Sequence, residues 1–172
     1  MEYTILDSPL GTILLSGNET ALTGLWFAGQ KYAPVRPPET SLSPAVLART
    51  REWLEAYWAG APLPPLPPLA PAGSPFRQAV WRLLGEIPYG ETTTYGALAR
   101  ALRSAGIPAA PQAVGGAVGH NPISILIPCH RVVGSGGSLT GYAGGLARKQ
   151  YLLKLEGVDL TRLTVPNRGT AL

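Results

Sequence analysis

A proline-rich segment, APLPPLPPLAPA at residues 61–72, interrupts this chain of 172 residues. Six of its twelve residues are proline. Each proline fixes φ and removes a backbone donor, so the segment cannot form a helix or a central strand. Such sequence is extended and semi-rigid. We therefore expect two lobes, residues 1–72 with this connector at their end and residues 73–172; a ligand for an SH3-type domain is the alternative interpretation.

The first lobe begins with strand-like sequence. Residues 3–27, YTILDSPLGTILLSGNETALTGLWF, contain three apolar runs separated by the turn sequences SPLG and GNET, which predicts a small antiparallel meander. Ser43 followed by Pro44 then predicts the start of a helix that Gly60 ends. We expect one apolar face on that helix, made of Leu47, Leu54, Tyr57 and Trp58.

The second lobe is predicted to be mostly helical. Ser74-Pro75 starts one helix, a second begins near Thr94, and a third covers residues 112–120 and stops before Pro122. The last two resemble a helix-turn-helix, although the loop RSAGIPAAP that joins them is long. The residues expected to face inward are Phe76, Val80, Leu83, Leu84 and Ile87 in the first helix and Tyr95, Leu98, Ala99 and Leu102 in the second.

Charge is distributed unevenly along a chain whose 45 per cent hydrophobic content is that of an ordinary globular protein. Residues 1–72 hold four basic and six acidic residues, a net charge of −2, whereas residues 73–172 hold ten basic and four acidic residues, a net charge of +6. The second lobe could therefore bind a polyanion, although a basic solvated face has the same signature.

Several classes of protein are excluded. The longest strongly apolar run, residues 124–128, is far shorter than the ~20 residues that span a bilayer. The opening MEYTILDSPLG lacks the pattern of a signal peptide, so we expect a cytoplasmic protein without a membrane partner. One cysteine excludes an internal disulfide, and one cysteine with two histidines cannot supply the usual four zinc ligands. We expect no metal and no cofactor.

That cysteine, Cys129, stands beside His130 in the sequence ILIPCHRVVG. A lone cysteine is most often a buried small hydrophobe, but a nucleophilic thiol needs a base to take its proton. If residues 125–129 form a strand, the two side chains point to opposite faces, so a water between them or a turn at Pro128 is required. The base needs an orienting carboxylate. Glu156, at the end of a helix over residues 144–157, opposes the helix dipole there; a solvated surface glutamate is the alternative.

Glycine is concentrated in the third predicted helix of the second lobe. Gly115, Gly116 and Gly119 each cost ~1 kcal/mol relative to alanine. The helix therefore has little side-chain bulk on at least one face. It either packs closely against another helix or lies deep in the groove of a ligand.

The sequence IPCHRV, preceded by AVGGAVGHNPISIL and followed by GSLTGYAGGLARKQYLLKLEG, resembles the O-6-alkylguanine-DNA alkyltransferase family. The resemblance covers about residues 74–156, without a gap from Gln112 onward, and SPLGTILLSGNETALTGLWF resembles the family's amino-terminal lobe more loosely. It implies an α/β fold: a small ribonuclease-H-like lobe with an antiparallel sheet, and a helical lobe of winged-helix or helix-turn-helix type.

The resemblance also implies direct-reversal DNA repair by a suicide methyltransferase. An alkyl group passes irreversibly, once per molecule, from O-6 of guanine, and from O-4 of thymine, to Cys129. His130 accepts the thiol proton through a water, and Glu156 orients His130. Asn121 is the hinge between the recognition helix and the active-site strand, and Tyr95 donates a hydrogen bond to a ring nitrogen of the flipped base.

The substrate-binding residues implied by the resemblance are Tyr142, Ala143, Val132 and Arg131. Tyr142 lines the alkyl pocket, the main-chain N–H of Ala143 faces O-6, and the carbonyls of Cys129 and Val132 accept from the exocyclic amine. The implied partner is double-stranded DNA, bound by a monomer through the minor groove, which is ~6 Å wide against ~12 Å for the major groove. The residues expected to contact it are Gln112, Ala113, Gly115, Gly116, Gly119, Thr94 and Tyr95.

One position departs from the family's pattern. Gln112 stands where the family usually has an arginine that enters the base stack, and glutamine lacks the charge and the stacking plane. Arg103, before the long loop, is a candidate to compensate. Two other functions stay open: a non-catalytic sensor of alkylated DNA, although related sensors lack the cysteine, and a cysteine hydrolase, which predicts turnover.

Overall fold

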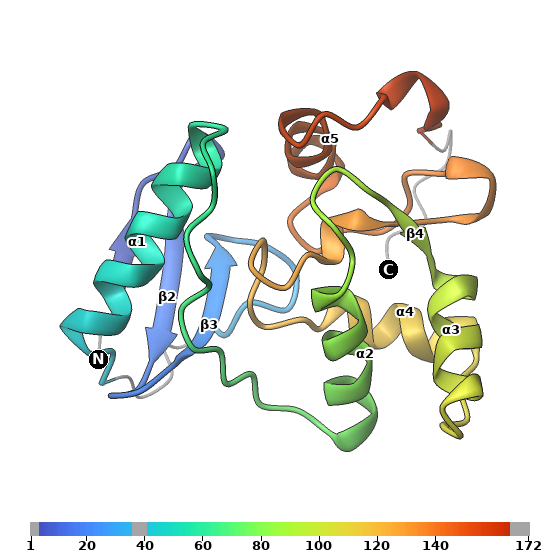
Figure 1. Ribbon diagram of the computed structural model, residues 1–172, viewed down its shortest axis with the longest axis horizontal. Coiled ribbons are helices and arrows are strands. Elements are labelled where there is room, and N and C mark those ends of the chain that lie inside the picture. Colours follow the sequence, from blue (N-terminus) through green and yellow to red (C-terminus); the bar gives the residue numbers. More distant parts are fainter. Residues whose placement is uncertain (1–3, 36–40, 166–172) are drawn as a thin grey trace. The chain divides into compact units, whose positions relative to one another are not determined.

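The chain divides into two compact units (Figure 1). The first consists of residues 1–72 together with residues 122–126, and the second of residues 73–121 and 127–172. The computed structural model describes residues 4–35 and 41–165. Within these ranges no helix combines the length and the apolar character needed to cross a bilayer.

A three-stranded antiparallel sheet forms the centre of the first unit. Its strands are β1 (Thr4–Leu6), β2 (Ile13–Gly17) and β3 (Leu22–Phe27), in that spatial order. The SPLG turn is closed by a reciprocal pair of backbone hydrogen bonds between Ser8 and Gly11. The predicted meander is confirmed.

Two distant segments cover the free edge of β3. At its start, Leu22 exchanges backbone hydrogen bonds of 2.8 Å with residues 68–70 of the proline-rich connector. Further along, Leu25 exchanges bonds of 2.8 and 3.0 Å with residues 122–124. The connector forms no helix, as its prolines predict, but its final residues are fixed to the sheet.

Helix α1 (Pro44–Trp58) packs against β3. As predicted, Ser43 caps it, accepting a hydrogen bond from the Val46 backbone N–H, and Gly60 follows its end with φ +63°. The predicted face was only partly right, because Leu47 and Trp58 are half-buried and the Trp53 ring stacks on Tyr57 at 5.2 Å in the interior. The fully buried face consists of Val46, Thr50, Trp53, Leu54 and Tyr57.

The second unit is mainly helical, with helices α2 (Pro75–Gly85), α3 (Tyr95–Ser104), α4 (Pro111–Gly119) and α5 (Leu146–Leu155). Ser74 and Thr94 cap α2 and α3 through their hydroxyls, as their sequence positions predict. Helices α2, α3 and α4 pack on one another, and Trp81 Nε1 donates to the Ala117 carbonyl at 2.8 Å. The predicted helical lobe, with α3 and α4 as consecutive packed helices, is confirmed.

The segment after α4 forms a turn at Pro128, which is one of the alternatives that the sequence left open. Residues 125–129 form no strand: Ile125 has φ +70°, and the Cys129 N–H bonds back to the Ile127 carbonyl at 2.8 Å. Pro128 then leads into the 3-10 helix η1 (Cys129–Arg131). Strand β5 (Val132–Val133) follows and pairs in parallel with β4 (Thr93–Thr94), and the remaining short helices are η2 (Ser135–Gly137) and η3 (Leu160–Arg162).

Candidate active site

Cys129 lies at the start of η1, where its side chain is buried and only 5 per cent of the residue is exposed. Asn121 secures this turn, because its Nδ2 donates to the Ile127 carbonyl at 2.8 Å. Burial raises the pKa of the Cys129 thiol, whereas a hydrogen bond from the Asn121 side chain and the positive charge of Lys149 lower it. Asn121 therefore both fixes the backbone before the cysteine and favours the thiolate.

His130 is completely buried beside Cys129. Its Nε2 bonds to Oε2 of Glu156 at 2.5 Å, whereas its buried Nδ1 has no hydrogen-bond partner among the described residues. A carboxylate only accepts, so the neutral ring carries its proton on Nε2 and a lone pair on Nδ1. Burial lowers the pKa of His130 most strongly, Glu156 raises it, and Arg131 and Lys149 lower it. The structure thus presents an imidazole with one free basic nitrogen.

Glu156 caps the C-terminus of α5 and has its carboxylate inside the protein. Besides His130, it meets two further donors: Arg131 Nε at 2.7 Å and the Gly90 backbone N–H at 3.2 Å, both on Oε1. Gly90 has φ +81°, and a Cβ there would lie 3.0 Å from the Glu156 carbonyl oxygen. Because the Glu156 carboxylate is buried and hydrogen-bonded, the alternative that Glu156 is a solvated surface residue is wrong.

Lys149 is a buried member of the site that the sequence analysis missed. Its Nζ donates to the carbonyls of Val132, at 2.5 Å, and Thr140, at 2.9 Å. Burial lowers its pKa to about 8, while the proximity of Cys129 raises it. A signal was available, since residues 149, 152, 153 and 156 share one helical face that is otherwise apolar or part of the predicted site.

Replacing Lys149 should weaken the thiolate. We expect Lys149→Met to raise the pKa of Cys129, because the nearby positive charge is lost, and to slow alkyl transfer about tenfold, as expected for ~1.4 kcal/mol of lost charge stabilisation. Titration of thiolate absorbance measures the first effect. Lys154→Met, an exposed change on the same helix, is the control, and identical titration curves for all three proteins would contradict the role of Lys149.

Tyr95, the first residue of α3, reaches the loop that follows β5. Its hydroxyl donates to the carbonyls of Thr140 and Gly141, each at 3.3 Å. Burial raises the pKa of Tyr95 to about 12, and the nearby Cys129 contributes to this increase, so the phenol stays a neutral donor. Tyr142 and Ala143 are half-buried in the same loop.

The two carbonyls predicted to accept from guanine each have one internal donor. The Cys129 carbonyl accepts from the Val132 N–H, and the Val132 carbonyl from Lys149. A carbonyl oxygen has a second lone pair, so these bonds are compatible with the prediction. Arg131 is different, because its guanidinium is held inside the protein by Glu156 and by the Ile87 carbonyl at 2.6 Å. Its role in binding substrate stays a prediction.

Helix α4 presents only part of the predicted DNA-contacting set to solvent. Gln112, Ala113 and Gly116 are exposed, and a Cβ on Gly116 would meet no atom within 4 Å. Gly115 and Gly119 are buried, and their contact with DNA stays a prediction. Positions four apart share a helical face, and this one lies inward, where α4 packs on α2 and α3.

Thr94 and Arg103, at the two ends of α3, have contacts within the protein. The Thr94 hydroxyl caps α3 by accepting from the Ala97 N–H at 3.1 Å. Arg103, proposed above as a substitute for the missing arginine, bonds through its exposed guanidinium to the Ala109 carbonyl at 2.7 Å. Arg103 is thereby tied to the loop that leads into α4.

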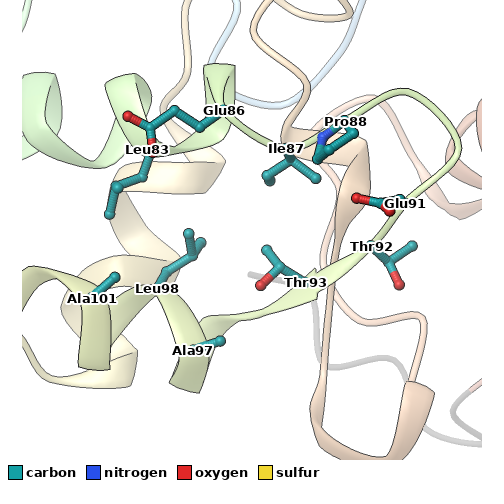
Figure 2. A pocket seen from close by; sticks show the side chains of 10 residues that line it. All are labelled: Leu83, Glu86, Ile87, Pro88, Glu91, Thr92, Thr93, Ala97, Leu98 and Ala101. Carbon is teal, nitrogen blue, oxygen red and sulfur yellow. The ribbon is translucent and has the colours of Figure 1, made fainter.

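A separate pocket of about 310 Å³ opens between the end of α2, the loop over residues 86–93 and the start of α3. Figure 2 shows Ile87, Leu98 and Thr93 pointing into it. None of the predicted site residues lines this pocket. Within residues 4–35 and 41–165, no group of three or more His, Cys, Asp or Glu side chains is placed to hold a metal ion.

Comparison with known families gives matches over both units. The ribonuclease-like domain of 6-O-methylguanine DNA methyltransferase matches residues 1–69, and the DNA binding domain of the same protein matches residues 75–158. Together these matches include nearly the whole chain and every residue of the site described above.

Individual relatives agree with these matches. A methylated-DNA–protein-cysteine methyltransferase of Mycolicibacterium paratuberculosis is 48% identical over 156 residues, covering 91% of this chain and 92% of the relative. One of Methanosarcina acetivorans is 46% identical, covering 91% and 99%. The crystal structure of Mycobacterium tuberculosis OGT in complex with DNA has a TM-score of 0.79 at 40% identity and covers 95% of each chain.

Proposed function

Because the chain belongs to the 6-O-methylguanine DNA methyltransferase family, we propose that it repairs DNA by moving an alkyl group from O-6 of guanine onto Cys129. The observation that carries this proposal is the buried arrangement of Cys129, His130 and Glu156, in which the imidazole keeps one free basic nitrogen. The cysteine keeps the group, so each molecule acts once.

Activation of the thiol starts the reaction. The Cys129 proton passes through a water to Nδ1 of His130, whose Nε2–H remains bonded to Glu156. The imidazolium that forms is stabilised by this carboxylate, and the new thiolate by Asn121 and Lys149. In this buried site, the neighbouring polar groups provide the charge stabilisation that solvent would provide in an open site.

Alkyl transfer is a displacement at carbon. The Cys129 sulfur attacks the alkyl carbon, an S–C bond forms, the C–O bond breaks, and its electron pair stays on guanine O-6. Tyr95 donates a hydrogen bond to a ring nitrogen and so stabilises the guanine anion, while Tyr142 lines the alkyl pocket and the Ala143 N–H faces O-6. The pKa of about 12 keeps Tyr95 protonated for this task.

The partner in this proposal is double-stranded DNA, entered through the minor groove by a monomer. The exposed residues of α4 are Pro111, Gln112, Ala113 and Gly116, and the lack of bulk at Ala113 and Gly116 suits a narrow groove. The target base rotates out of the stack to reach Cys129. A thiol that must stay reduced fits a cytoplasmic location.

A stoichiometric repair assay tests the function. The protein is mixed with excess duplex containing one O-6-methylguanine, and restored guanine is counted by nucleoside analysis. We expect restoration to stop at one guanine per protein molecule. Continued turnover would point to a hydrolase, and binding without restoration to a sensor; either result would overturn the proposal.

Gln112 offers a test of base extrusion. An arginine at this position can stack on neighbouring bases, and stacking contributes ~1–3 kcal/mol per base in single-strand binding. We expect Gln112→Arg to speed transfer from duplex DNA several-fold, about 3- to 10-fold, and to leave reaction with the free base O-6-benzylguanine unchanged. Stopped assays with both substrates measure this. If the rates with both substrates rise equally, or neither rate rises, Gln112 does not limit base extrusion, and Arg103 or the long loop becomes the candidate for that role.

A further inference from the structure

Arg131 is the least expected member of the buried network, because its charge is neither exposed nor directed at a substrate. The residue is 7 per cent exposed. Its Nε donates to Glu156 at 2.7 Å and its Nη1 to the Ile87 carbonyl at 2.6 Å, while the centroid of the Tyr89 ring lies 5.8 Å from the guanidinium carbon. An arginine fork held at both ends in this way has one orientation.

The loop over residues 87–90 also helps to hold the Glu156 carboxylate. Ile87 anchors Arg131, Tyr89 donates to the Leu155 carbonyl at 3.3 Å, and the Gly90 N–H donates to Glu156 Oε1 at 3.2 Å. Arg131 and Gly90 thus occupy one carboxylate oxygen, and His130 receives the other. Two donors therefore hold Oε1 in place, and Oε2 faces the imidazole.

From this geometry we infer that Arg131, together with the loop over residues 87–90, is a positioning residue that fixes Glu156 so that His130 keeps its proton on Nε2 and its basic lone pair on Nδ1. The inference rests on the proposed function, since the lone pair matters only if it activates Cys129. Arg131 acts through Glu156 and touches neither the thiol nor the alkyl group.

The charge of Arg131 has a second effect on His130. The charged and titratable groups around the imidazole are Glu156 and Lys149 on α5, Arg131 and Cys129 on η1. Glu156 raises the pKa of His130, whereas Arg131 and Lys149 lower it. Removing Arg131 should therefore favour the imidazolium, which cannot accept the thiol proton.

The test compares pH profiles of four proteins reacting with O-6-benzylguanine, which needs no base extrusion. Relative to wild type, Arg131→Gln should react at least about tenfold more slowly at pH 7, a part of the 10²–10⁴-fold that a general base contributes. The acid limb of its rate profile should move to higher pH, so the deficit grows as pH falls. Arg131→Lys, which keeps the charge but not the fork, should recover part of the rate.

Glu91→Gln is the matched control, because Glu91 is an exposed residue directly after this loop and lines the separate pocket. It should behave as wild type. Unchanged pH profiles for Arg131→Gln at an unchanged melting temperature would overturn the inference. Failure of the proposed function looks different, because wild type itself would then gain no alkyl group.

A measurement on the unmodified wild-type protein covers the case in which Arg131→Gln does not fold. Nitrogen-15 NMR of His130 distinguishes its tautomers. We expect the neutral imidazole to carry its proton on Nε2 and to leave Nδ1 unprotonated. A neutral imidazole with its proton on Nδ1 would overturn the inference without any variant.

Discussion

Cys129→Ser should abolish alkyl transfer and leave DNA binding intact. A hydroxyl is a far weaker nucleophile than a thiolate at neutral pH, so we expect the rate to fall by at least about a thousandfold. Serine is nearly the same size and can keep the hydrogen bond from Asn121, so the turn at η1 should persist. We expect DNA binding to depend on other residues of the basic unit.

Two assays separate these expectations. Mass analysis after incubation with alkylated oligonucleotide reports transfer, and fluorescence anisotropy with unmodified duplex reports binding. We expect Cys129→Ser to bind the duplex as wild type does and to gain no mass. Loss of both activities together would instead identify Cys129 as a structural residue.

Glu156→Gln should have the second-largest effect, about 10²-fold on transfer, the lower end of what a general base contributes. Glu156 raises the pKa of the buried His130 imidazole. A neutral amide removes this support, so the pKa of His130 falls, the base weakens and the pKa of the Cys129 thiol rises. Arg131→Gln shifts the pKa of His130 in the opposite direction, which distinguishes the two variants.

Titration of thiolate absorbance measures the Glu156→Gln effect directly. The same substitution at Glu91, whose side chain is exposed on the loop after α2, controls for the loss of a negative charge from this unit. We expect the thiolate to appear at higher pH in Glu156→Gln only. Superimposable curves for the three proteins would remove Glu156 from the activation of Cys129.

Local rules were sufficient to predict where most elements begin. Ser43, Ser74 and Thr94 cap helices whose starts follow from a hydroxyl before a helical pattern. Turn sequences likewise predicted the meander. These features depend on residues within a few positions of one another, so they could be read from the sequence.

Features that depend on tertiary packing could not be predicted in this way. Whether Gly115 and Gly119 face DNA or a neighbouring helix depends on which side of α4 packs inward, and the sequence left both possibilities open. The apolar run at residues 125–129 likewise left open whether the segment is a strand or turns at Pro128, and the folded chain forms short backbone turns there. That turn replaces the opposite-facing arrangement that a strand would give Cys129 and His130.

The charged network was the least predictable part of the site. Glu156 was expected from the family resemblance, but its bond to Arg131 joins residues 25 positions apart. Lys149 carries a charge and would ordinarily be placed on the surface, yet it is fully buried because two carbonyls accept from its ammonium group. Only the folded chain brings these partners together.

The central claim is that Cys129 itself receives the alkyl group, once, and keeps it. Intact-mass analysis after incubation with an O-6-methylguanine oligonucleotide, followed by peptide mapping, tests this most directly. We predict a gain of one CH₂ per molecule, located on the peptide that contains Cys129, with no further gain on longer incubation or with more oligonucleotide. An unmodified Cys129 in a protein that has restored guanine, or a CH₂ on any other peptide, would contradict the account.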